Sequence, residues 1–254
     1  MKLALVQYDP VWEDKQQSKN RITQLFDLYK ERADLVIFPE MTLTGFTMKA
    51  SEMAEPVKGD SYTFFSNLAK EKNCTVLAGI IERSGAHIFN SLLHINWQGD
   101  LMDVYRKIHP FTNSGEDKNY EAGENPVTAV INGWKVGLSI CYDLRFPELY
   151  RFYGKRKAGL IINIANWPVP RIEHWRALLK ARAIENQCYV AGVNRVGSDP
   201  EAHQYNGFSS VFDPMGKEIA TLENDQNIIS AEIDFASIEK VRSQLPFLDD
   251  IKLI

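Results

Sequence analysis

The 254-residue sequence has neither an excess of basic residues nor long hydrophobic runs. It contains 29 Lys and Arg against 33 Asp and Glu, a formal net charge of −4. A nucleic-acid-binding protein usually shows a basic excess, so the composition argues against that class. No apolar stretch approaches the length of a membrane-spanning helix. We therefore expect neither nucleic acid nor a membrane among its partners.

Cysteine is also scarce. Only Cys74, Cys141 and Cys188 are present. An odd, low count without regular spacing favours free thiols in a reducing compartment. The apolar run from Leu3 to Val6 is too short for the core of a signal peptide, and acidic residues follow soon after it. These features predict a cytoplasmic protein.

The common cofactor and metal motifs are missing as well. Neither GxGxxG nor GxxxxGKS/T occurs, so dinucleotide and P-loop nucleotide binding lose their usual signals. The five histidines form no HExxH or HxH pattern and no CxxC is present, which disfavours a metal site. The absence of GxSxG disfavours a serine-hydrolase elbow.

No low-complexity segment, Gly/Ser linker or charge block marks a boundary, so a single domain over residues 1–254 is predicted. Short apolar runs alternate with longer amphipathic segments. The expected strands are Leu3–Tyr8, Leu35–Phe38, Val76–Ile81, Phe89–Asn96, Val104–Ile108, Val127–Ile131, Trp134–Cys141, Leu160–Ala165, Tyr189–Val196, Phe208–Phe212 and Ile228–Ile233. The expected helices are Lys15–Arg32, Ser61–Lys72, Glu148–Arg156 and Glu173–Gln187. Several strands lack polar alternation, which is typical of strands covered on both faces.

Turn signals and a faint internal repeat add to this pattern. Asn132-Gly133 can supply the two positive φ values of a type I′ hairpin turn. Gln98-Gly-Asp100 and Asp213-Pro-Met-Gly216 are further hairpin turns. The segment Lys2–Asp9 resembles Lys135–Asp143. Together these features predict an α/β protein with two sheets or one very large sheet.

Three chemically useful side chains stand where apolar strands end. Cys141, Glu40 and Lys107 each stand at the end of such a run. Ligands of α/β proteins gather at the carboxyl ends of strands, and a helix start next to Cys141 would favour its thiolate. Taken singly, the residues suit a core thiol, an exposed acid and a solvated lysine. Together they supply the nucleophile, base and oxyanion stabiliser of acyl transfer. Cys74 and Cys188 are expected in the core.

Five segments then occur in a characteristic order over nearly the whole chain. They are Phe38-Pro-Glu40, Tyr105-Arg-Lys-Ile-His109, Ile140–Glu148, Ala165-Asn-Trp167 and His174–Val190. In these segments the chain resembles the nitrilase (carbon–nitrogen hydrolase) superfamily, most closely its omega-amidase branch. The resemblance implies a four-layer αββα sandwich, with two mixed sheets between outer helices. It also implies a Glu40–Lys107–Cys141 triad, assisted by a second glutamate. Glu116 fits that role by position, with Glu121 and Glu124 as alternatives.

The resemblance also implies a reaction. An omega-amidase cleaves the terminal amide of a small dicarboxylic 2-oxo acid, such as 2-oxoglutaramate, through a cysteine thioester and without a metal or organic cofactor. Another small aliphatic amide, a carbamoyl amide or a nitrile remains an alternative substrate. A non-water acceptor would make the protein an acyltransferase, and loss of catalysis would leave a binding protein on the same scaffold.

Several roles remain open between two readings. Arg145 either clamps a substrate carboxylate with two parallel hydrogen bonds or pairs with an internal acid. The backbone N–H of Tyr142 is a candidate oxyanion donor. Phe46, Trp167 and Tyr120 either line the pocket or are core aromatics. The family resemblance predicts a homodimer, and Trp175, Leu178 and Leu179 are bulky enough to anchor either the core or the partner.

Overall fold

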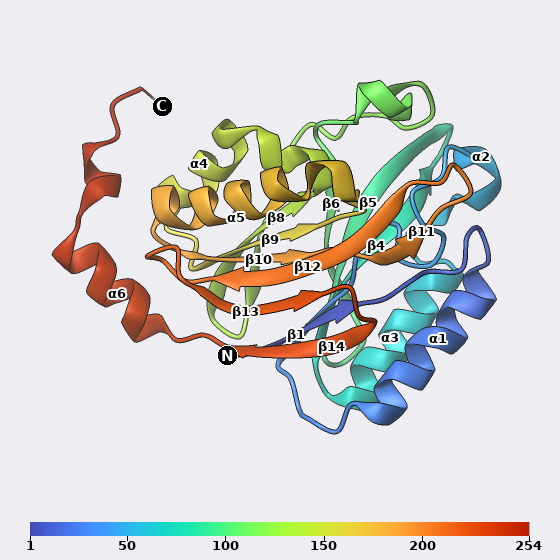
Figure 1. The fold of residues 1–254 in the computed structure, drawn as a ribbon, viewed down its shortest axis with the longest axis horizontal. Coiled ribbons are helices and arrows are strands. Elements are labelled where there is room, and N and C mark those ends of the chain that lie inside the picture. Colours follow the sequence, from blue (N-terminus) through green and yellow to red (C-terminus); the bar gives the residue numbers. More distant parts are fainter. Residues whose placement is uncertain (254) are drawn as a thin grey trace.

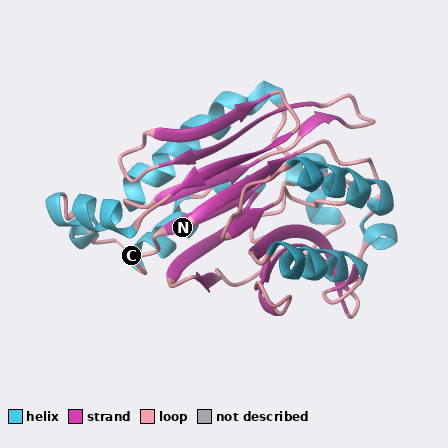
Figure 2. Ribbon diagram, turned by 90° about the horizontal axis from the view of Figure 1, so that it is seen from below, coloured by secondary structure: helices cyan, strands magenta, loops and turns pink. Residues whose placement is uncertain are grey.

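The computed structural model describes residues 1–253, in which two seven-stranded sheets lie face to face between two layers of helices (Figures 1 and 2). The first sheet has the order β14 (Asn227–Glu232), β1 (Lys2–Gln7), β2 (Leu35–Ile37), β4 (Thr75–Ser84), β5 (His87–Ile95) and β6 (Leu101–Arg106), with β3 (Glu55–Pro56) pairing with β4. The second has the order β11 (Val196–Ser198), β12 (Gln204–Phe212), β10 (Tyr189–Val193), β9 (Leu160–Ile164), β8 (Trp134–Ile140) and β7 (Thr128–Ile131), with β13 (Glu218–Glu223) pairing with β12.

The outer layers are two pairs of helices. The pair α1 (Lys15–Leu28) and α3 (Asp60–Lys72) covers the first sheet, and α4 (Pro147–Lys155) and α5 (Ile172–Asn186) cover the second (Figure 1). The remaining helices are the short α2 (Ala50–Met53) and α6 (Phe235–Gln244). No helix among residues 1–253 combines the length and apolar character needed to cross a bilayer. The predicted four-layer α/β architecture is confirmed.

Burial on both faces explains the uninterrupted apolar strands. Along β1, Leu3 and Leu5 belong to the core between the two sheets. Ala4 and Val6, which alternate with them, belong to the core between the first sheet and its helices. Successive side chains of a strand point to opposite faces, so a strand between two cores must be apolar at every position.

The internal repeat is visible in the topology. Strands β1-β2-β4-β5-β6 pair in the order parallel, parallel, antiparallel, antiparallel. Strands β8-β9-β10-β12-β13 repeat that order in the second sheet. The similar segments found in the sequence are the first strands of the two halves. Because β6 runs in the same direction as β2, their carboxyl ends lie at the same edge of the first sheet.

The structure also corrects parts of the sequence reading. The run Tyr189–Val196 was expected to be one strand, but β10 ends at Val193 and β11 begins at Val196. Strands β3 and β13 and helices α2 and α6 were not expected. Trp175 and Leu179 are fully buried in the core, so they do not anchor a partner. The Asn132-Gly133 turn does have two positive φ values, 48° and 80°, as predicted.

Candidate active site

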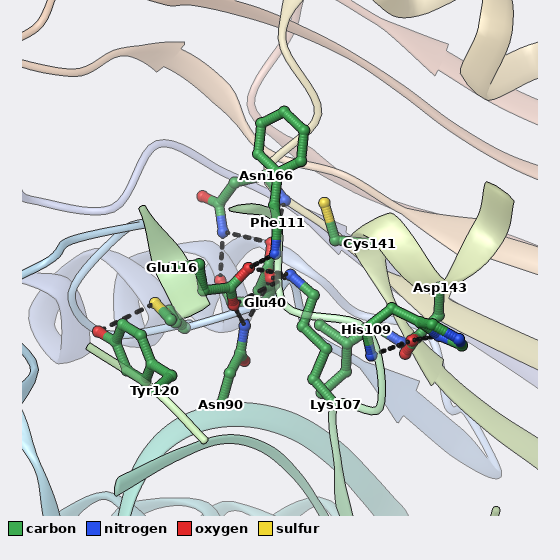
Figure 3. Close-up of polar contacts among 12 residues, drawn as sticks. Glu40, Asn90, Lys107, His109, Phe111, Glu116, Tyr120, Cys141, Asp143 and Asn166 are labelled. Atoms are coloured by element: carbon green, nitrogen blue, oxygen red, sulfur yellow. Dashed lines mark hydrogen bonds and ion pairs between the residues drawn. The ribbon is translucent and has the colours of Figure 1, made fainter. Parts of the chain in front are cut away.

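The four residues proposed for catalysis come from four different places in the chain and meet at one edge of the sandwich (Figure 3). Glu40 lies three residues beyond the end of β2, and Lys107 directly follows β6. Cys141 directly follows β8, and Glu116 begins a short 3₁₀ turn, Glu116–Lys118. The direction shared by β2 and β6 brings the carboxylate and the ammonium together, and the packing of the two sheets adds the thiol.

Glu40 is held by donors on both carboxylate oxygens. Its Oε1 accepts hydrogen bonds from Nζ of Lys107 at 2.8 Å and from Nδ2 of Asn90 at 2.7 Å. Its Oε2 accepts from the backbone N–H of Asn166 at 2.9 Å. The Glu40 side chain has no exposed surface. A buried carboxylate whose two oxygens are both hydrogen-bonded has a fixed orientation and is well placed to exchange a proton with a neighbouring group.

Glu116 is the second carboxylate on Lys107. Nζ of Lys107 lies 2.9 Å from Oε2 and 3.1 Å from Oε1 of Glu116. Oε2 also accepts the backbone N–H of Phe111 at 2.6 Å, and Oε1 accepts Nδ2 of Asn90 at 2.8 Å. Asn90 therefore donates to both glutamates and fixes the spacing of the two carboxylates. Glu121 and Glu124, the alternatives from the sequence, are both exposed and lie outside this cluster.

Burial and neighbouring charges shift the pKa values of Lys107 and Glu116. Burial alone would lower the pKa of Lys107, but Glu116 and Glu40 together raise that pKa well above its usual range. Lys107 is therefore an ammonium at neutral pH. Burial raises the pKa of Glu116, and Lys107 opposes that effect.

Cys141 stands at a sharp change of chain direction. Its φ is +46°, and the strand β8 gives way here to the 3₁₀ turn Cys141–Arg145. Burial raises the pKa of the Cys141 thiol well above its ordinary value, and Glu40 raises it further. The nearby ammonium of Lys107 only partly opposes them. The sequence predicts that the helix start next to Cys141 favours its thiolate, whereas burial and Glu40 act on the pKa of this thiol in the opposite direction.

A buried aspartate joins the cysteine turn to the lysine segment. Asp143 is fully buried, and its Oδ2 accepts from the backbone N–H of Ile140 at 2.9 Å and from the hydroxyl of Tyr105 at 2.7 Å. Its Oδ1 accepts from the backbone N–H of His109 at 3.0 Å and contacts His109 Nδ1 at 2.7 Å. Tyr105 and His109 lie two residues before and after Lys107, so one carboxylate ties both sides of the lysine to the residue preceding Cys141.

A cavity of about 310 Å³ opens over the cluster. Cys141 lies in its wall, together with Tyr142, Arg145, Phe46 and Trp167, as expected for substrate-binding residues. Tyr120 is not part of that wall. Its ring packs with Met41 in a separate buried cluster, and its hydroxyl donates to the carbonyl of Thr47 at 2.5 Å. Of the two readings for Tyr120, the structure supports the core aromatic.

The Arg145 guanidinium has no acidic partner in the described part of the chain. Among residues 1–253 no carboxylate forms an ion pair with it. Its guanidinium lies 4.8 Å from the ring centre of Trp167, and Nη2 lies 3.3 Å from Nδ1 of His174. The guanidinium therefore faces the cavity with its ion-pairing capacity unused.

Sequence reasoning missed four residues of this site. Asn166 had a signal, because it follows the end of β9 as Glu40 follows β2. Asp143 lies within one of the segments that carry the family resemblance, and Arg171, which lines the cavity, lies between two of them. The sequence alone indicated no role for either residue. Asn90 lies inside β5, where no local pattern marks it. Within the described part of the chain, no three His, Cys, Asp or Glu side chains are grouped so that they could hold a metal ion.

Comparison with known proteins adds independent information. The family model described as carbon–nitrogen hydrolase matches residues 2–243. The chain is 31% identical to a 2-oxoglutaramate amidase of Bacillus subtilis, covering 98% of this chain and 97% of that protein. It is 34% identical to the omega-amidase YafV of Escherichia coli strain K12, covering 98% of this chain and 96% of that protein.

Solved structures agree with the fold. A protein of Xanthomonas campestris described as a CN-hydrolase superfamily member, with an arsenic adduct in its active site, has a TM-score of 0.95 and 31% identity, covering 100% of this chain and 98% of that one. Nit3 of Saccharomyces cerevisiae, a member of the nitrilase superfamily, has a TM-score of 0.86 and 29% identity, covering 97% of this chain and 94% of that one.

Proposed function

We propose a substrate and a mechanism for this chain from the premise that it belongs to the carbon–nitrogen hydrolase family, in which it is a cysteine-dependent amidase. It hydrolyses the terminal amide of a small dicarboxylic 2-oxo acid, such as 2-oxoglutaramate, to the acid and ammonia through a thioester on Cys141. The observation that carries the proposal is a cavity lined by both Cys141 and the Arg145 guanidinium, with the buried Lys107 ammonium and its two carboxylates next to Cys141.

The first half-reaction begins from a neutral thiol. Glu40 accepts the Cys141 proton as sulfur attacks the amide carbon, because the raised pKa of the thiol keeps it protonated until then. The carbonyl oxygen becomes an oxyanion, stabilised by Lys107 and the backbone N–H of Tyr142. Lys107 has a donor for it: its 2.9 and 3.1 Å contacts with Glu116 can share one N–H, which leaves another of the three for the oxyanion.

The same groups complete the first half-reaction and carry out the second. Protonated Glu40 gives its proton to the departing nitrogen, the C–N bond breaks, and ammonia leaves. Glu40 then takes a proton from water, whose oxygen attacks the thioester. Collapse of this second adduct breaks the C–S bond, releases the carboxylic acid and returns the proton to Cys141. Glu116 stays in place throughout and orients Lys107.

The proposed substrate class, an amide that also bears a carboxylate, rests on Arg145. A guanidinium binds a carboxylate through two parallel hydrogen bonds. The 4.8 Å contact with Trp167 supports the guanidinium from one side and leaves its N–H edge for a ligand. Binding a remote carboxylate there holds the amide carbon near Cys141, which lowers the barrier by pre-ordering the reactants.

Ammonia release tests the reaction across a panel of small amides, carbamoyl compounds and nitriles. The 2-oxo dicarboxylate mono-amide should be hydrolysed much faster than the neutral amide of the same length. Intact mass after a substrate pulse should show an acyl adduct at Cys141. Cys141→Ala should be inactive and folded, whereas Cys74→Ala and Cys188→Ala should keep most activity. An active Cys141→Ala protein would refute the mechanism.

The role of Arg145 has its own test. Arg145→Lys keeps the charge but cannot reproduce the two-pronged geometry, so the preference for the acid over the neutral amide should fall. The variant should still react with a small alkylating reagent at Cys141, which separates substrate binding from thiol activation. An unchanged ratio of kcat/KM for the acid and neutral amides in the folded variant would remove the clamp.

A further inference from the structure

A second arginine, Arg171, lines the same cavity. It ends the 3₁₀ turn Val169–Arg171, and its backbone carbonyl accepts the indole N–H of Trp167 at 2.7 Å. Its guanidinium lies 5.4 Å from the ring centre of Phe111. Among residues 1–253 no carboxylate forms an ion pair with it. The guanidinium of Arg171 has no role in the proposed mechanism.

Trp167 connects the two arginines. Its ring lies 4.8 Å from the guanidinium of Arg145, and its indole N–H donates a hydrogen bond to the backbone carbonyl of Arg171. Phe111, beneath the Arg171 guanidinium, donates its backbone N–H to Glu116. Both arginines therefore line the same cavity, and each of them contacts Trp167. Two cations around one small volume favour an anion and disfavour a third positive charge.

The two acidic residues of the cavity wall have partners other than the two arginines. Asp199 lines it, but its oxygens accept from the Tyr205 hydroxyl at 2.8 Å, from the backbone N–H groups of Glu201 and His203 at 3.0 Å, and contact His203 Nδ1 at 3.0 Å. The Glu201 side chain is 75% exposed, so solvent screens its charge. Neither acid pairs with the two arginines.

We propose that Arg171 is a specificity-determining residue that selects omega-amides of 2-oxo acids against those of 2-amino acids. The inference rests on the proposed function. With the amide carbon at Cys141 and the carboxylate at Arg145, we infer that the carbon next to the carboxylate comes within reach of the Arg171 guanidinium, because Arg171 lines the same cavity. A 2-oxo oxygen there accepts an N–H from Arg171. A 2-ammonium group there meets like charge, so L-glutamine is rejected by repulsion as well as by the loss of that hydrogen bond.

Three substrates of equal length isolate the effect: 2-oxoglutaramate, glutaramate and L-glutamine. They share the terminal amide and the carboxylate and differ only at the carbon beside the carboxylate. For the wild type, kcat/KM should fall in that order. At an effective dielectric constant near ~20, repulsion between two unit charges about 6–12 Å apart corresponds to a factor of about 10- to 100-fold. Arg171→Gln should raise the ratio of L-glutamine to glutaramate by about that factor and lower the ratio of 2-oxoglutaramate to glutaramate.

Charge and shape are separated by a second variant. Arg171→Lys should keep most of the rejection of L-glutamine and lose part of the preference for the 2-oxo group, because an ammonium keeps the charge without the planar fork. Arg156→Gln is the matched control. Arg156 also lies over an aromatic ring, that of Phe152 at 3.4 Å, but outside the cavity, so its loss should change neither ratio.

The outcomes distinguish this inference from the proposed function. A wild type that releases no ammonia from 2-oxoglutaramate or glutaramate would refute the proposed function itself. A wild type that hydrolyses both, while folded Arg171→Gln leaves the L-glutamine to glutaramate ratio within twofold, would overturn only the role of Arg171. The variant should fold, since the contact that Arg171 makes with Trp167 uses its backbone carbonyl.

Discussion

Replacing Lys107 with methionine should leave two carboxylates facing each other without a cation. Lys107 has 1% of its side chain exposed, and Glu40 and Glu116 have none. Removing one partner of a buried ion pair typically costs about 3–5 kcal/mol, because a charge is left unpaired. Typical domains have a free energy of unfolding of roughly 5–15 kcal/mol, so Lys107→Met should remain folded but lose a large part of its stability.

The loss should depend on pH in a defined direction. Two close carboxylates raise each other's pKa, so the folded variant holds a proton that the unfolded chain releases above a pKa near ~4.3. Stability is then greatest below that value and is lost as the pH rises through the raised folded pKa. The slope is at most about 1.4 kcal/mol per pH unit for one proton. Relative to wild type, Lys107→Met should be less stable at pH 8 than at pH 5.

Urea unfolding at both pH values measures this, with ammonia release as the second assay. Loss of an oxyanion donor should reduce kcat by about 10²- to 10³-fold. The double variant Lys107→Met/Glu116→Gln removes one of the leftover charges, so it should regain stability at pH 8 without regaining activity. Wild-type activity in Lys107→Met would refute the oxyanion role. A stability loss that is equal at both pH values and not rescued by Glu116→Gln would refute the electrostatic argument.

Three further predictions concern other parts of the molecule. Asp143→Asn cannot accept all the hydrogen bonds that the carboxylate accepts, so kcat should fall by about 10-fold or more with little change in KM, and steady-state kinetics that show an unchanged kcat would contradict the positioning role. Burial raises the pKa of Cys188 to about 12, so the folded state keeps a proton that the unfolded chain loses above a pKa near ~8.5. Wild type should therefore lose about 2 kcal/mol more than Cys188→Ala between pH 8 and pH 10 in chemical unfolding, and equal losses would count against it. Light scattering should give twice the chain mass of 29.0 kDa for a homodimer, and the single-chain value at micromolar concentration would exclude it.

Local sequence determined where the reactive groups stand. Apolar strand patterns are short-range, so they identified β2, β6 and β8 to within a few residues and indicated Glu40, Lys107 and Cys141 near the ends of these strands. The Asn132-Gly133 turn is equally local, because its two positive φ values depend on those residues alone. Strand β13 was not predicted, because its local sequence pattern does not indicate a strand. Half-buried and exposed residues alternate in Glu218–Glu223, none of them is fully buried, and only pairing with β12 makes the segment a strand.

Tertiary structure decided which groups meet and in what protonation state. Three glutamates follow Lys107 at similar separations, and only the path of the loop places Glu116, rather than Glu121 or Glu124, on the ammonium. Asn90 acquires its role from its register in β5, opposite the end of β6. The protonation state of the Cys141 thiol is likewise decided by tertiary structure. Local sequence offers it the amides of a turn, but its pKa is raised by burial and by Glu40, 101 residues earlier, because desolvation and charge act through space and not along the chain.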